Sequence, residues 1–323
     1  MNVQETQISY DEGQVLKGKR GNSWFAILLA LLSIPLIILG ICLLIFVSVT
    51  IAGVAFLILT ILLLVVGVGL LITSGVYHVN STVRVETRHF SVNGHPHIVI
   101  NNEVGTIHVK ASSDAATVTF QTKRHARRIG KAANESWVSY EQLNEGNEIR
   151  ADIERVYSPS TNNLPQSIDF NITVPHNADL ELNSSVGDIW VTGISGQLSV
   201  QSDIGSIYVK EGLLSGNSVL KTNLGSVNFH EAIDPYGIFQ LATETGSVHV
   251  ILPDDTPFEL DASTNFGNIT TVVPDIKMAY RTSSEVHGDA GIPPRASLTL
   301  RSITGSVSVF EESDGHIPNW GES

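Results

Sequence analysis

Between residues 82 and 311, a glycine followed two residues later by isoleucine or valine occurs seven times at related spacings. The seven glycines are Gly105, Gly187, Gly205, Gly225, Gly246, Gly267 and Gly305. From Gly187 to Gly267 they lie 18, 20, 21 and 21 residues apart, and the last gap of 38 residues is close to two periods. Self-similarity at this period is typical of repeat folds, in which each unit buries its apolar face against the next.

Apolar residues keep a fixed register around each glycine. Seven and five residues before Gly205 stand Leu198 and Val200, and two and four residues after it stand Ile207 and Val209. Such alternation predicts strand, bend, strand, with every second side chain facing inward. The glycine falls at the bend, where it either adopts a backbone conformation closed to other residues or lets neighbouring units approach closely.

These patterns predict an all-β fold, a parallel β-helix or β-solenoid of about 20-residue coils over residues 82–311. The irregular segment at about residues 111–178 is expected to be an antiparallel insertion. Gly288, 21 residues after Gly267, marks a further, degenerate coil. Residues 312–323 are expected to form a loose tail.

The segment from Trp24 to Ile72 is almost wholly apolar, and no charged residue occurs between Arg20 and Arg84. It is too long for one crossing of a hydrocarbon core about 30 Å thick, so we expect a hairpin of two transmembrane helices within residues 23–76, at about 24–47 and 51–73. A signal peptide is not expected, because its apolar core is shorter than this segment. The alternative to the hairpin is a single span followed by an interfacial helix. Residues 1–22 are expected to be a disordered tail.

Basic residues on both sides of the hairpin favour a multi-pass cell-membrane protein whose two ends face the cytoplasm, with the external side left open. Lys17, Lys19 and Arg20 precede the first helix, and Arg84 and Arg88 follow the second. The lipid bilayer is therefore an expected partner. The net charge of −13 argues against nucleic acid as another.

At these columns the chain resembles a bacterial family of β-strand-repeat proteins of unknown function, labelled as candidate adhesins or head-GIN-like domains. The match runs from about Ile98 to Val309 and is tightest from Leu180 to Val250. The resemblance implies a β-solenoid anchored at a membrane. It carries over no catalytic residue.

A candidate partner surface lies three residues after the glycines, at His108, Trp190, Tyr208 and His249. Trp190 and Tyr208 on neighbouring strands, about 4.8 Å apart, are expected either to form an aromatic shelf for a sugar ring or a peptide, or to pack across the strands. One residue after the glycines stands a column of small polar residues, which is expected to satisfy backbone groups at the bends.

Catalytic, metal and cofactor sites are not expected. His89, His95 and His97 have a spacing that can approach a metal, but no acidic residue or cysteine completes a ligand set. The acidic residues Asp254, Asp255 and Asp261 resemble the clusters of polysaccharide-cleaving β-helices, and the first two fall in an expected turn.

The sequence therefore favours a non-enzymatic, membrane-anchored solenoid that presents an adhesin-like interaction surface to a protein or a cell-envelope polymer. A cytosolic scaffold that senses membrane stress through its helical hairpin is the second hypothesis. A carbohydrate-active enzyme is the third.

Overall fold

The computed structural model describes residues 23–46, 60–68, 80–114, 116–128, 136–155 and 167–312. The chain divides into two compact units. One contains Arg84–Arg124 and Asn134–Ser323, and the other contains Val15–Val83 and His125–Ala133. In the second unit lie helix α1 (Ser23–Phe46), with Pro35 inside it, and a shorter helical segment at residues 60–68.

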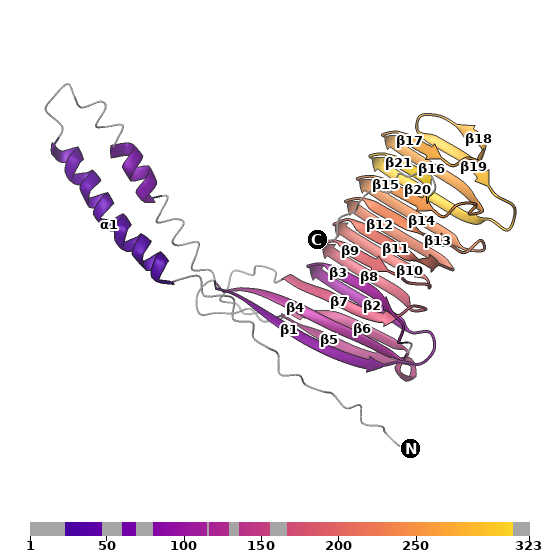
Figure 1. The fold of residues 1–323 in the computed structure, drawn as a ribbon, viewed down its shortest axis with the longest axis horizontal. Coiled ribbons are helices and arrows are strands. Elements are labelled where there is room, and N and C mark those ends of the chain that lie inside the picture. The colour runs from indigo at the N-terminus through magenta and orange to yellow at the C-terminus, as the bar shows by residue number, and fades with distance from the viewer. Residues whose placement is uncertain are drawn as a thin grey trace, which may run out of the picture. The chain divides into compact units, whose positions relative to one another are not determined.

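The strands form two large sheets, and the order of the strands within each sheet differs from their order in the sequence (Figure 1). The ten-stranded sheet, called sheet A here, has the order β1 (Asn80–Ser91), β4 (Thr117–Arg128), β7 (Ser167–Pro175), β3 (Ile107–Ser112), β9 (Ile189–Thr192), β11 (Ile207–Leu214), β13 (Val227–Ile233), β15 (Val248–Leu252), β21 (Val307–Glu311) and β17 (Ile269–Val272).

The eleven-stranded sheet is called sheet B. Its order is β18 (Lys277–Arg281), β19 (Glu285–Ala290), β16 (Phe258–Phe266), β20 (Ala296–Thr304), β14 (Ile238–Thr245), β12 (Asn217–Leu224), β10 (Leu198–Ile204), β8 (Asp179–Val186), β2 (His97–Val104), β6 (Glu148–Arg155) and β5 (Ser136–Leu143). A short 3₁₀ turn, η1 (Asn144–Gly146), joins β5 to β6.

The alternating aliphatic residues of both sheets form one core. Ile207 and Val209 of β11 are fully buried, as are Leu198 and Val200 of β10. Ile207 lies in parallel register with Ile189 on one side and Val227 on the other, so equivalent positions of successive units stand in columns. Each buried side chain of this size contributes roughly 1.5–3 kcal/mol of hydrophobic stabilisation, set against the entropy of ordering the chain.

The bend glycines stack directly on one another. Gly205 has a φ of +150°, and a Cβ built there would lie 2.1 Å from the carbonyl oxygen of Gly187. Both the backbone conformation and the close approach of the next strand therefore require glycine. The same contact recurs along the file, which includes all seven repeat glycines.

The file departs from chain order at its C-terminal end. A Cβ on Gly305 would meet the carbonyl oxygen of Gly246, and one on Gly267 would meet that of Gly305. Gly305 thus lies between Gly246 and Gly267, because β20 is inserted between β14 and β16, and β21 between β15 and β17. The last two strands of the chain, β20 and β21, therefore lie inside the two sheets and not at their edges.

The predicted fold class is wrong. In place of a parallel solenoid with coils stacked in chain order, the described residues form two mixed sheets, in which β5 pairs antiparallel with β6, and β19 with both β16 and β18. Gly288 is not the bend of a coil, since it lies on β19 opposite Leu260 of β16. Within residues 111–178, β6 and β7 pair parallel with β2 and β3.

The predicted transmembrane hairpin is also wrong. Of the predicted second span, the structure describes a helical segment at residues 60–68, about 13 Å at 1.5 Å per residue, and the rest of that span lies outside the described residues. In the part of the chain that the structure describes, none of the helices has the length and apolar character that crossing a bilayer requires. Three predictions rested on this hairpin and are not supported: the multi-pass membrane location, the bilayer as a partner and the inside orientation. The predicted tail at 1–22, and the predicted tail at 312–323 apart from residue 312, lie outside the described residues.

Candidate functional site

Three rings follow one another across the outer face of sheet A: His108 on β3, Trp190 on β9 and Tyr208 on β11. They face outward because the residues on either side of each, such as Ile189 and Val191, are buried in the core. The parallel register places Trp190 opposite both His108 and Tyr208. We call these three residues the aromatic file.

The rings of the aromatic file stack on one another. The centroids of Trp190 and Tyr208 lie 3.8 Å apart with an interplanar angle of 9°, and those of His108 and Trp190 lie 6.0 Å apart at 6°. The faces of the Trp190 ring are therefore taken by its two neighbours. A sugar ring cannot lie flat on Trp190, and a partner meets the edges of the rings.

His249 does not join the aromatic file. Asn228 of β13 stands next to Tyr208 in the same column, and His249 of β15 comes only after it. At the other end, Asn171 of β7 stands next to His108. The structure thus brings together three of the four predicted surface residues.

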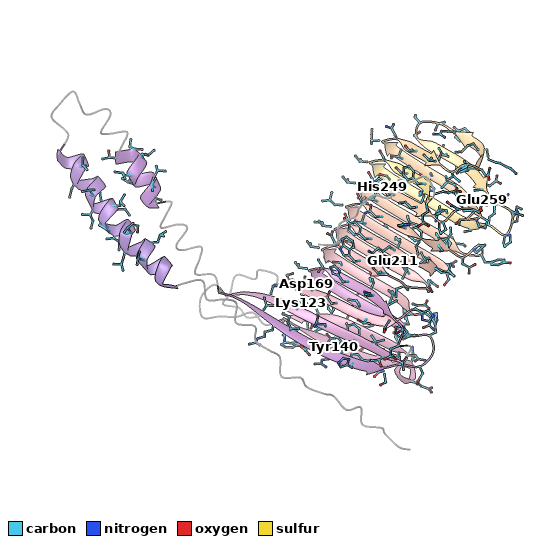
Figure 2. All side chains as sticks on the ribbon, in the orientation of Figure 1. Lys123, Tyr140, Asp169, Glu211, His249 and Glu259 are labelled. Carbon is cyan, nitrogen blue, oxygen red and sulfur yellow. The ribbon has the colours of Figure 1, made fainter. Side chains whose placement is uncertain are left out.

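Charged groups surround the His108 end of the file. Burial lowers the pKa of His108, Asp169 and Asp188 oppose that shift, and Lys123 adds to it. Figure 2 shows Asp169 and Lys123 close together, with His249 farther along sheet A. Burial also lowers the pKa of His249. Both imidazoles are neutral at physiological pH and can each donate and accept one hydrogen bond.

The polar tips of the two larger rings are unused within the described part of the chain. Neither Nε1 of Trp190 nor the hydroxyl of Tyr208 makes a hydrogen bond there, and both side chains are partly exposed. By contrast, Nε1 of Trp137 on β5 donates to Oε2 of Glu154 at 2.8 Å. The aromatic file therefore presents an indole N–H and a phenol hydroxyl beside apolar ring edges.

The small polar column one residue after the glycines satisfies backbone groups. The backbone N–H of Ser206 donates to Oδ1 of Asp188 at 2.7 Å, and that of Ser226 donates to the Ser206 hydroxyl at 3.1 Å. The same contact links Ser247 to Ser226. These side chains hold the bends together.

A second polar column, three residues before the glycines, was not predicted. The buried hydroxyl of Thr222 donates to the carbonyl oxygen of Gly205 at 2.8 Å, and that of Thr243 donates to the carbonyl oxygen of Gly225 at 2.7 Å. The signal was present in the sequence, because Asn, Ser or Thr stands at this position in every unit: Asn102, Ser184, Ser202, Thr222, Thr243, Thr264 and Ser302.

The three histidines considered for a metal do not converge. His95 pairs with Asp179, its Nε2 lying 2.8 Å from Oδ2, whereas Nδ1 of His89 lies 2.9 Å from the hydroxyl of Thr119. His97 begins β2. Among the described residues, no group of three or more His, Cys, Asp or Glu side chains is placed to hold a metal ion.

The acidic residues considered for catalysis fall in two places. Asp255 lines an open hollow of about 450 Å³ together with Asp275 and Glu311. Asp261 lies on β16, where its Oδ1 is 3.5 Å from Nδ1 of His287. Asp254 precedes Asp255 in the turn between β15 and β16. The three acidic residues therefore do not line one cleft.

Comparison of the sequence with known protein families and with curated proteins gives no match. Among solved structures, a candidate cell-adhesion protein from Clostridium sporogenes is similar with a TM-score of 0.45 and 13% identity, covering 71% of this chain and 100% of that chain. A candidate adhesin from Bacteroides fragilis is similar with a TM-score of 0.31 and 13% identity, covering 70% of this chain and 96% of that chain. A candidate adhesin from Parabacteroides distasonis has a TM-score of 0.29 and 10% identity, covering 70% of this chain and 96% of that chain. These bacterial neighbours are described as adhesion proteins, and their descriptions mention neither a membrane anchor nor the head-GIN label.

Proposed function

We propose that the protein is a non-enzymatic, adhesin-like binding protein whose partner surface is the aromatic file of His108, Trp190 and Tyr208. The observation that carries the proposal is the stack itself. Two large rings, packed at 3.8 Å on adjacent strands, stand on the outer face of a sheet with their polar tips unpaired. Tyrosine and tryptophan with an apolar body and a polar tip are enriched at binding surfaces.

The orientation of the rings favours an extended partner. Because the faces of Trp190 are covered, binding relies on ring edges, the indole N–H and the phenol hydroxyl. Such a row suits a chain that offers hydrogen-bond acceptors at regular intervals along its length. A protein segment in extended conformation, with its carbonyl oxygens, is the partner that fits best, and a cell-envelope polymer is the alternative.

Rigidity of the stack supports this role. Each ring is held by its neighbours and by a parallel sheet in fixed register, so little side-chain freedom remains to be lost when a partner binds. The neutral state of His108 removes a positive charge from its end of the surface, which leaves Lys123, Asp169 and Asp188 to set the charge there.

The test measures binding of the full chain to two probes: fluorescein-labelled, denatured casein by anisotropy, and purified peptidoglycan by co-sedimentation. We expect casein to bind and Trp190→Ala to weaken binding about tenfold or more, in line with an interface tryptophan worth over 1 kcal/mol. Trp190→Phe keeps a ring and removes the N–H, and we expect its affinity to lie between those of the wild type and Trp190→Ala.

Trp137→Ala is the matched control, because Trp137 is another exposed tryptophan, outside the aromatic file. Equal losses in the two alanine variants, or no binding to either probe by the wild-type chain, would refute the proposal. Binding of peptidoglycan alone, lost in Trp190→Ala, would keep the surface and change the partner to the polymer.

A further inference from the structure

A row of exposed apolar side chains runs along the corner where sheet B turns into sheet A. It is formed by the residue just before each bend glycine. Ile204 is 48% exposed, Leu224 50% and Phe266 73%, and Val186 is similarly open. We call Val186, Ile204 and Leu224 the corner stripe.

The corner stripe is continuous because the strands are in register. Val186 lies opposite Ile204, and Ile204 lies opposite Leu224. Thr245 and Thr304 follow at the same position, and then Phe266. At about 4.8 Å per strand, the row from Val186 to Phe266 is roughly 24 Å long.

The bend does not require apolar side chains at this position, since Thr245 and Thr304 occupy it in two of the units. Single exposed aliphatic residues are common on protein surfaces and need no explanation. A contiguous row in register is different, because an extended apolar patch on a folded protein marks an interaction surface.

Carboxylates accompany the stripe. Asp203 and Glu244 stand one residue before Ile204 and Thr245, both are exposed, and neither forms an ion pair within the described residues. The amide of Asn223 donates to Asp203 at 3.2 Å, which leaves the carboxylate free to accept more. Lys221, three residues before Leu224, is the nearest basic side chain along β12.

This combination selects between occupants. If a second copy of the chain docked with its own stripe, Asp203 and Glu244 of the two copies would approach each other, and like charges at an interface oppose binding. A segment with the opposite charge gains from the same carboxylates. We propose that the corner stripe docks a cationic amphipathic protein segment, with its apolar residues on Ile204 and Leu224 and its Lys or Arg side chains at Asp203 and Glu244.

The test uses a synthetic amphipathic helix of leucine and lysine, labelled with fluorescein, and a matched helix of leucine and glutamate. We expect the full chain to bind the lysine peptide and to bind the glutamate peptide far less. Ile204→Ser combined with Leu224→Ser should weaken binding about tenfold, because roughly half of each side chain remains to be buried by the partner. Asp203→Asn with Glu244→Gln should weaken it several-fold and reduce its dependence on salt.

Tyr236→Ser is the matched control, since Tyr236 is 81% exposed in the turn before β14 and away from the stripe. Trp190→Ala should also leave peptide binding unchanged, which separates this surface from the aromatic file. Circular dichroism confirms that each variant is folded.

Equal binding of the lysine peptide by the wild-type chain and by the Ile204→Ser, Leu224→Ser variant would overturn the proposal. So would equal binding of the two peptides. A wild-type chain that ignores both peptides but forms dimers in sedimentation equilibrium, with the dimer lost in the double variant, would assign the stripe to a second copy.

Discussion

Replacing Glu231 with glutamine is expected to stabilise the protein at alkaline pH and to leave its stability almost unchanged in acid. Glu231 lies on the inward side of β13, two residues after Phe229, and is 3% exposed. Both of its carboxyl oxygens are buried without a hydrogen-bond partner. Oε1 occupies space that a side chain at Gly212 of β11 would fill, 2.0 Å from the position of a Cβ there.

Burial without a partner raises the pKa of Glu231 from 4.5 to about 8. The folded state therefore keeps a proton that the unfolded state releases. The contribution of Glu231 to stability is therefore greatest below pH 4.5, falls as the pH rises towards 8, and levels off above it. At about 1.4 kcal/mol per pKa unit, the loss reaches roughly 5 kcal/mol above pH 8 and about 3 kcal/mol near pH 7.

The assay is urea unfolding of the wild-type chain and Glu231→Gln at about pH 5, 7 and 9, followed by tryptophan fluorescence. The difference in unfolding free energy between the two proteins should grow with pH in favour of the variant. Glu259→Gln is the control, because Glu259 is an exposed strand residue and its substitution should leave the pH profile unchanged. A difference between wild type and Glu231→Gln that stays constant from acid to alkaline pH would refute the reasoning.

Two further substitutions test the bends. Gly205→Ala should cost roughly 3 kcal/mol or more, because its Cβ would lie 2.1 Å from the Gly187 carbonyl oxygen at a φ of +150°. Gly94→Ala, with φ +73° and open space around it, should cost only about 1 kcal/mol when both variants are compared by urea unfolding, and equal losses would contradict the stacking. Thr222→Val should cost about 1–3 kcal/mol, since it leaves the part-buried carbonyl oxygen of Gly205 without its hydroxyl donor. Thr245→Val, at an exposed position, should be nearly neutral in the same urea titration, and an equal loss there would argue against the hydroxyl column.

The register of the strands could be predicted because it depends on residues that are close together in the sequence. Glycine and the aliphatic residues on either side of it recur at fixed offsets, and period-two alternation determines which side chains are buried. The inward position of Glu231 follows from the same alternation, counted on from Val227 and Phe229. A carboxylate at an inward position of an aliphatic column is a signal that sequence reasoning could have used.

The order of the strands could not be predicted because the units are nearly interchangeable. Val307 and Val309 of β21 fit beside Val248 and Val250 of β15 as well as any other aliphatic pair would. In β17 the equivalent positions hold Ile269 and Thr271, a weaker pair. Inserting β21 beside β15 puts the stronger columns together and leaves β17 at the edge of the sheet. That preference depends on contacts between residues distant in sequence, which periodicity does not encode.

The aromatic file was predicted as a column, with two arrangements of its rings left open. Equal offsets from Gly105, Gly187 and Gly205 place His108, Trp190 and Tyr208 side by side whatever their rotamers. Whether the rings lie flat on the sheet or stack edge-on to solvent depends on side-chain torsions that neighbouring rings decide together. The observed 9° between the rings of Trp190 and Tyr208 corresponds to the second expectation, packing across the strands, and not to an open shelf.

The bend glycines fix both proposed surfaces at once. The residue before each glycine belongs to the corner stripe, and the residue three positions after it belongs to the column of the aromatic file. Contacts such as that between Gly205 and Gly187, and the hydroxyl of Thr222 on the Gly205 carbonyl oxygen, hold the spacing between strands at the corner. Side chains on both surfaces are therefore positioned before a partner arrives, which lowers the entropy cost of binding. A substitution that loosens the corner should weaken binding at both surfaces, whereas a substitution within one surface should weaken binding at that surface alone.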